Sequence, residues 1–248
     1  MTIALLARTS RTLVRVPALV ASPVLMSAFF LFIYAGQLGS AGGAMLGGAS
    51  YLAFIVPLVL LTTAFNGGAL AGQLLVRDMT SGYHRRLLLS RAGRARLVAA
   101  PLLVGGGVLA VQALVIVGAG MVLGMRPSPG EAAGLVLGTA VAGLGFSLLG
   151  AAAAIRWSVD AAVSATVAIV FSLSFLTSAF APREDLSGWM GAVAAVNPVT
   201  YVLEGLRAVG GGAAPAGALL PGVVTLVGLL AVGSAACAWA FRAEEAAR

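Results

Sequence analysis

The chain has 248 residues, of which 60% are hydrophobic and 9% charged, and its net charge of +7 comes from arginine because the sequence contains no lysine. About 25% of the residues of a soluble domain are charged, and a soluble fold with so few would expose apolar side chains and aggregate. The composition therefore excludes an ordinary soluble protein, including one that binds nucleic acid. It predicts an all-α integral membrane protein in a lipid bilayer.

The N-terminal segment, residues 1–18, carries Arg8, Arg11 and Arg15 on one helical face. Two interpretations remain open for it. One is an interfacial helix that lies on the anionic inner leaflet, and the other is a loose tail that only sets orientation. The apolar run that follows is too long for a signal peptide and lacks a convincing small-residue cleavage site, so we expect the segment to stay attached.

Uncharged runs predict six transmembrane helices, each holding about 20 residues. The first run is long enough for two helices, and its Gly- and Ser-rich middle, Gly36–Ser50, is predicted to be the turn between them. Glycines four residues apart, such as Gly134 and Gly138, favour close packing of the helices. The predicted spans are Leu19–Ala35, Tyr51–Leu75, Leu97–Met125, Ala132–Ile155, Ala161–Pro182 and Ala208–Phe241.

Residues 77–96, between the second and third spans, contain six arginines. This segment is either a short amphipathic docking helix for a cytoplasmic protein or a positive loop that only sets topology. The residues alone leave both interpretations open.

The region 183–217, between the fifth and sixth spans, mixes charges and aromatic residues with an Asn197-Pro198 break. Apolar residues recur at helical spacing on both sides of this break: Trp189, Val193 and Val196, then Val202, Leu206 and Val209. We predict two short amphipathic helices that lie at the membrane interface or dip into it, hinged at Asn197-Pro198. Glu204 and Arg207 are one helical turn apart, and either they form an ion pair or they are two separate solvated surface charges.

Arginines are distributed unevenly over the predicted loops. Twelve of the fifteen fall on the side that carries both termini. Cytoplasmic loops hold the excess of positive charge, so we expect a multi-pass protein of the cell membrane with both termini in the cytoplasm.

Several kinds of chemistry lack their residues in this chain. A Walker phosphate loop requires a lysine, so the chain is not expected to be an ATPase or another enzyme. One cysteine, Cys237, and one histidine, His84, cannot build a metal cluster or a cofactor site. The predicted span centres hold no ionisable residue, which argues against a proton relay. If transport by this chain uses energy, a partner protein must therefore supply it.

Residues 180–207 resemble the signature of ABC-2 type transporter permeases, especially the daunorubicin-resistance-like drug exporters. The matching positions are Phe180, Pro182, Leu186, Trp189, Asn197, Pro198, Thr200 and Arg207. Residues 77–96 resemble the coupling helix of this family through Asp78, Gly82, Arg86 and Ser90. The sequence departs from the family pattern at Ser187 and Arg91, where proline is frequent.

The resemblance implies a single transmembrane domain, 1–248, with an N-terminal interfacial helix (1–18), six spans, a coupling helix region (77–96) and a re-entrant extracellular helical hairpin (183–217). The residues expected to couple to the ATPase are Asp78, Gly82, Arg86, Leu88 and Ser90. The functional residues expected in the hairpin are Trp189, Asn197, Pro198, Thr200, Glu204 and Arg207.

The resemblance also implies partners and a cargo. Two permease subunits, identical or close paralogues, would work with two copies of an ABC ATPase subunit that bind ATP and Mg. The cargo would be a hydrophobic or amphiphilic substrate, such as a drug, an antibiotic or a lipid, moved out of the cell. The alternatives are an exporter of polysaccharide or glycolipid and, outside this family, a channel or a membrane enzyme.

Overall fold

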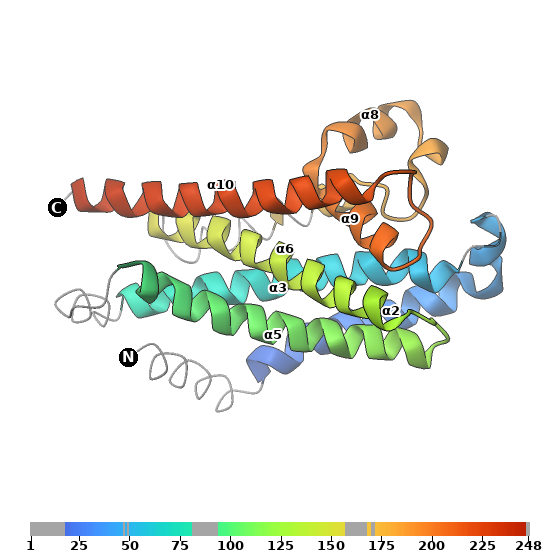
Figure 1. Ribbon diagram of the computed structural model, residues 1–248, viewed down its shortest axis with the longest axis horizontal. Helices are drawn as coiled ribbons and strands as arrows, with labels where there is room; N and C mark the ends of the chain where they lie inside the picture. Colours follow the sequence, from blue (N-terminus) through green and yellow to red (C-terminus); the bar gives the residue numbers. More distant parts are fainter. Residues whose placement is uncertain are drawn as a thin grey trace.

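The computed structural model describes residues 18–46, 48, 50–80, 94–156, 168–169 and 172–246. Every regular element in these ranges is helical. The elements are α2 (Ala18–Met45), α3 (Tyr51–Thr80), α5 (Arg94–Val122), α6 (Pro129–Arg156), the 3-10 turn η1 (Arg183–Asp185), α8 (Gly188–Val196), α9 (Pro198–Val209) and α10 (Leu219–Ala246). The five long helices lie side by side in one bundle, with α8 and α9 gathered at one end (Figure 1).

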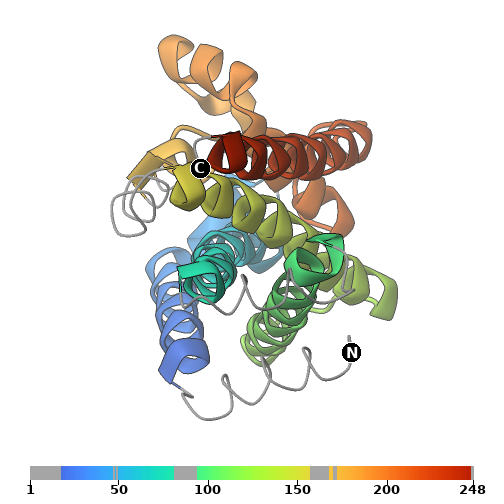
Figure 2. The ribbon, with the colours of Figure 1, turned by 90° about the vertical axis from the view of Figure 1, so that its left-hand side faces the viewer.

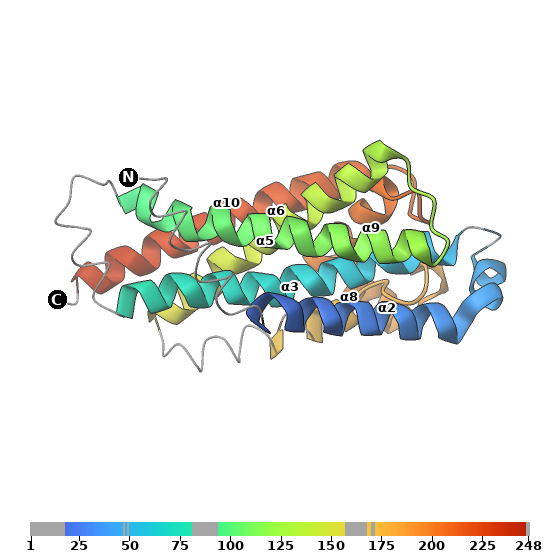
Figure 3. The same cartoon turned by 90° about the horizontal axis from the view of Figure 1, so that it is seen from below.

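The long helices alternate in direction. Helices α2 and α5 run towards the end of the bundle that carries α8 and α9, whereas α3, α6 and α10 run away from it (Figures 1 and 3). Figure 2 looks along the bundle and shows α8 projecting outside it, beyond α10. Such long antiparallel neighbours are the arrangement expected when consecutive helices cross a membrane.

Three helical stretches in the described part of the chain are long and apolar enough to cross a bilayer: Leu103–Val122, Pro129–Arg156 and Leu219–Ala243. Shorter apolar runs, Val24–Gln37 and Tyr51–Asn66, lie in α2 and α3. These helices confirm an all-helical membrane protein. The number of six spans stays a prediction, because the predicted fifth span lies largely outside the described residues.

The predicted turn at Gly36–Ser50 is wrong over most of its length, since α2 continues to Met45. Glycine costs about 1 kcal/mol relative to alanine inside a helix, which is why the sequence favoured a turn here. Tertiary packing overrides this preference. A Cβ atom at Gly42 would lie 2.6 Å from Cγ of Tyr51, so the glycine lets the two helices approach closely.

The core of the bundle is centred on the first half of α3. All its residues from Ala53 to Leu61 are apolar and buried. Helix α3 packs against α2, α5, α6 and α9. The outer face of α10 is different, because its large apolar side chains are exposed. They include Leu220, Val224, Val227 and Val232. Exposed apolar faces of this extent suit contact with lipid.

Glycines allow α9 to pack closely against the long helices α6 and α10. A Cβ atom at Gly205 would lie 2.8 Å from Cα of Gly222 in α10, so the two backbones touch directly where these helices cross. On the other side, Gly138 in α6 makes room for Leu206, and Gly134 makes room for Val209. The predicted close packing at Gly134 and Gly138 is therefore present, and its partner is α9.

Candidate functional site

The residues expected to couple to an ATPase are only partly covered by the structure. Asp78 belongs to the last turn of α3. The other four, Gly82, Arg86, Leu88 and Ser90, lie outside the described residues. The coupling role of this segment stays a prediction.

Asn197 begins α9 and also binds the segment that precedes η1. Its Oδ1 accepts a hydrogen bond from the N–H of Val199 at 3.0 Å, while Pro198 occupies the first helical position, where no N–H is needed. Its Nδ2 donates to the carbonyls of Leu173 and Leu176 at 2.8 and 2.9 Å. These carbonyls lie at the end of the helical turn 172–175, and that of Leu173 also accepts a hydrogen bond from the N–H of Leu176 at 3.2 Å. One amide therefore caps two helical ends.

Arg207 lies in the last turn of α9 and is 1% exposed. Its guanidinium donates to three backbone carbonyls: Nε to Phe54 at 3.0 Å, Nη1 to Ser178 at 2.6 Å and Nη2 to Ala179 at 2.7 Å. It also lies 3.5 Å from the centroid of the Phe54 ring, a cation–π contact. Burial lowers the pKa of Arg207 to about 9, and the Glu204 carboxylate opposes this shift, so the guanidinium stays charged at neutral pH.

Glu204 does not pair with Arg207, so the predicted ion pair is wrong. The carboxylate binds Arg183 of η1 in a two-pronged arrangement, with Nη2–Oε2 at 2.9 Å and Nε–Oε1 at 3.2 Å. The Ser178 hydroxyl donates to the same carboxylate at 3.1 Å. Helical spacing places Glu204 near Arg207. However, the guanidinium of Arg207 binds backbone carbonyls, and Glu204 binds Arg183 of η1 instead.

The remaining residues that were expected in the hairpin lie apart from these contacts. Thr200 is completely buried, and its hydroxyl makes no hydrogen bond to any described residue. Trp189 on α8 is 68% exposed. Helix α8 contains only apolar residues and glycine, so the prediction that it is amphipathic is wrong, although the two short helices do meet at Asn197 and Pro198.

Together, Asn197, Glu204 and Arg207 form what we call the polar node, with Arg183 and Ser178 as the partners that the sequence analysis did not identify. The node joins α9 to α3, to residues 173–179 and to η1. In the described residues, no group of three or more His, Cys, Asp or Glu side chains could hold a metal ion. The node contains one ion pair, between Arg183 and Glu204, and several side-chain hydrogen bonds to backbone carbonyls. These contacts hold segments of the chain together.

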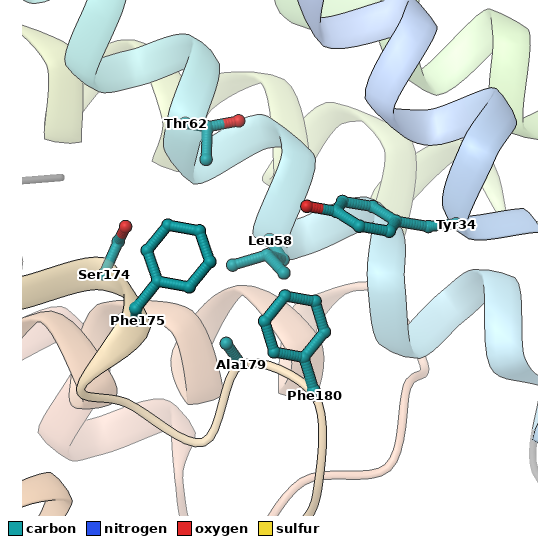
Figure 4. Close-up of a pocket in the computed structure, with 7 residues that line it drawn as sticks. All are labelled: Tyr34, Leu58, Thr62, Ser174, Phe175, Ala179 and Phe180. Atoms are coloured by element: carbon teal, nitrogen blue, oxygen red, sulfur yellow. The ribbon is translucent and has the colours of Figure 1, made fainter. Parts of the chain in front are cut away.

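A depression lies beside the node, between α2, α3 and residues 174–180 (Figure 4). The space that it encloses is small, about 20 Å³. The aromatic rings of Tyr34 and Phe180 meet edge to face at 5.6 Å between centroids, and those of Phe175 and Phe180 are 6.1 Å apart. The lining residues within the described part of the chain, none of which is charged, are Tyr34, Leu58, Thr62, Ser174, Phe175, Ala179 and Phe180.

Comparison with known proteins identifies the family. The family model described as ABC-2 type transporter matches residues 2–209, from the N-terminal segment to the end of α9. No curated protein matches the chain significantly. The match covers well over half of the sequence and includes both the polar node and the aromatic depression. The chain therefore belongs to the ABC-2 type transporter family and is a membrane permease subunit of an ABC transporter, which works with an ABC ATPase subunit.

Proposed function

We propose that this permease exports a hydrophobic or amphiphilic molecule, such as a drug, an antibiotic or a lipid, and that two copies of a separate ATPase drive it. A second permease subunit, identical or closely related, would complete the transporter. The observation that carries this proposal is the aromatic-lined depression in an apolar helical bundle, whose described lining residues carry no charge. Ligand sites of this composition favour apolar molecules with few polar groups.

Helix α3 supports a mechanism that couples the ATPase to the opposite end of the bundle. Its 30 residues run from Tyr51 to Thr80, a length of about 45 Å at 1.5 Å per residue. Its last turn leads into the proposed coupling segment, and its first turns carry the Phe54 carbonyl that Arg207 binds. ATP binding would close the ATPase pair and displace the coupling segment, and α3 would carry this displacement to the polar node.

We place both termini in the cytoplasm and α8 and α9 at the outer side, because twelve of the fifteen arginines then lie inside. Cysteine labelling in intact cells tests this orientation after Cys237 is replaced by alanine. A cysteine introduced at Ser128 should react with an impermeant reagent, and one at Gly93 should not. Labelling at Gly93 would reverse the proposed orientation.

Export of a polysaccharide or glycolipid by the same architecture is less well supported. A sugar chain presents many hydroxyl groups, and each one buried without a hydrogen bond costs free energy. Among the described residues that line the depression, three carry a hydroxyl group: Tyr34, Thr62 and Ser174. Its lining therefore favours an apolar ligand.

The proposed function can be tested on the permease co-purified with its ATPase and reconstituted in lipid. We expect a panel of amphiphiles, and not saccharides, to stimulate ATP hydrolysis and to be transported. Gly82→Pro and Leu88→Asp change the coupling segment and keep all its arginines. Both variants should insert normally, bind the ATPase more weakly and lose the stimulated hydrolysis. Wild-type export by both variants at equal membrane abundance would refute the coupling role.

A further inference from the structure

One amide group of α3 is exposed in the part of the bundle that is expected to contact lipid. Asn66 is exposed and lies about 22 Å along the helix from Tyr51, at 1.5 Å per residue. Helix α3 begins at the end of the bundle that carries α8 and α9 (Figure 1), and the hydrocarbon layer of a bilayer is about 30 Å thick. Counted from Tyr51, Asn66 therefore lies inside this layer, with a polar side chain at the surface of the bundle.

The contact between α2 and α3 gives the depth of Asn66 independently. The hydroxyl groups of Thr63 and Ser27 lie 2.8 Å apart, and both residues are buried. The two helices are antiparallel, so Asn66, almost one turn beyond Thr63, lies level with the residues just before Ser27. These include Leu25 and Met26, which are 68% and 52% exposed. Asn66 is therefore at the level of exposed apolar side chains rather than at the polar boundary of the membrane.

The hydrogen-bonding groups of Asn66 are only partly used. Its Nδ2 donates to the carbonyl of Thr62 at 3.0 Å. An asparagine side chain has two donor hydrogens and an acceptor oxygen, and no other described residue binds the amide of Asn66. Lipid chains offer no partner, and an unsatisfied polar group in hydrocarbon is costly. A neighbour that both donates and accepts hydrogen bonds would therefore stabilise this face of α3.

Helix α5 shows the contrasting case of a face that suits lipid. Its amide residue, Gln112, is completely buried. The exposed residues between positions 103 and 122 are apolar or glycine, and they are Leu103, Gly107, Val111, Leu114, Val115, Met121 and Val122. Because α5 buries its amide while α3 exposes one, the two surfaces are suited to different neighbours.

We propose that the face of α3 that carries Asn66 contacts a second copy of this chain, and that the two Asn66 amides form hydrogen bonds with each other. An amide both donates and accepts, so it is self-complementary, and a two-fold axis can place the same residue of two copies face to face. Asparagine side chains hold membrane helices together in this way. This inference rests on the second permease subunit of the proposed function and names the surface where that subunit binds.

The aromatic-lined depression lies on the same face of α3. Leu58, Thr62 and Asn66 are four residues apart, so they lie along one side of the helix, and Leu58 and Thr62 line the depression (Figure 4). The depression therefore opens towards the second copy rather than towards lipid. The Thr62 hydroxyl donates to the carbonyl of Val59 at 2.8 Å, and its oxygen can still accept a hydrogen bond from the second copy.

Association of the full-length permease in liposomes tests the proposal. It is measured by energy transfer between copies labelled at a cysteine in place of Ala246, after Cys237 is replaced by alanine, as the protein is diluted with lipid. We expect wild type to associate and Asn66→Leu to weaken association about fivefold, the effect of one hydrogen bond between membrane helices. Asn66→Gln keeps the amide and should weaken it less. Leu114→Ala is the matched control, because Leu114 is 61% exposed on α5, and it should associate like wild type.

Cross-linking in membranes that contain the permease and its ATPase measures whether the two faces meet. With Cys237 again replaced by alanine, Asn66→Cys should form a disulfide-linked dimer on oxidation, and Leu114→Cys should stay monomeric. A monomeric wild type would overturn the proposal, and so would wild-type association of Asn66→Leu. Rapid reaction of Asn66→Cys with a charged thiol reagent, without any dimer, would indicate a water-filled surface and overturn the contact as well.

Transport assays on the same membranes separate this inference from the proposed function. Export of amphiphiles by a permease that shows neither cross-linking at residue 66 nor any effect of Asn66→Leu would overturn the interface and leave the exporter function intact. A dimer that depends on Asn66, without amphiphile-stimulated ATP hydrolysis or export, would support the interface and overturn the exporter function.

Discussion

Replacement of Arg207 by alanine is the most direct test of the polar node. The change removes three hydrogen bonds from a charged donor to backbone carbonyls and leaves the carbonyls of Phe54, Ser178 and Ala179 without this partner. A hydrogen bond to a charged group contributes about 1.5–3 kcal/mol, but the three share one side chain and their contributions do not add. We expect Arg207→Ala to lower the free energy of unfolding by about 3–5 kcal/mol, as when a buried charged network is broken.

Arg207→Lys separates charge from shape. Lysine keeps the positive charge, but its compact ammonium group cannot reproduce the planar fork that reaches three carbonyls in different segments. The destabilisation should therefore be intermediate, about 2 kcal/mol. Arg126→Ala serves as the control, since Arg126 is exposed in the turn between α5 and α6. Its effect should stay within about 0.5 kcal/mol, as for most surface substitutions.

The measurement is equilibrium unfolding of the purified permease in detergent, supported by the abundance of each variant in the membrane. If Arg207→Ala unfolds at the same free energy as Arg126→Ala, the carbonyl contacts do not hold α9 and our account of the node is refuted. Adding Glu204→Ala should not rescue Arg207→Ala, because the partner of this carboxylate is Arg183. A rescue would indicate that Glu204 and Arg207 pair after all.

Three further predictions concern the contacts around α9. A double-mutant cycle between Arg183→Ala and Glu204→Ala should give a coupling free energy of about 1 kcal/mol in unfolding measurements, because one partner is partly exposed; strictly additive losses would contradict the pair. Gly205→Ala should cost about 1–3 kcal/mol because its Cβ atom meets the α10 backbone, whereas Gly191→Ala on α8, with open space around it, should be neutral. Asn197→Ala should cost about 1–2 kcal/mol through the lost cap, and a thermal stability equal to wild type would exclude that role.

The sequence predicts well those features that depend on neighbouring residues in the chain or on the overall composition. An asparagine followed by proline encodes the start of a helix, since the amide caps the first turn and proline fits the first position. The structure begins α9 at Pro198 for this reason. The low content of charged residues likewise requires a membrane setting in any arrangement of the helices.

The contacts of the polar node could not be predicted, because they depend on the tertiary fold. Arg207 binds carbonyls that are 28, 29 and 153 residues away in the chain, and backbone carbonyls have no sequence signature. The local rule that pairs side chains three residues apart predicted that Glu204 pairs with Arg207. In the fold, η1 brings Arg183 within 2.9 Å of the Glu204 carboxylate. The extension of α2 to Met45 has the same origin, since the contact between Gly42 and Tyr51 appears only when the helices pack.

The form of the polar node restricts how α9 can move. A carbonyl-bound arginine holds α3 and residues 178–179 through one rigid guanidinium, so a displacement of either segment strains all its hydrogen bonds together. Among the described residues, no carboxylate forms an ion pair with the buried guanidinium that could replace these hydrogen bonds, because Glu204 is bound to Arg183. If the coupling segment moves α3, the displacement either carries α9 and residues 178–179 with it or breaks the node completely. A partial slip would leave a buried charge without partners, which is the most costly outcome of the three.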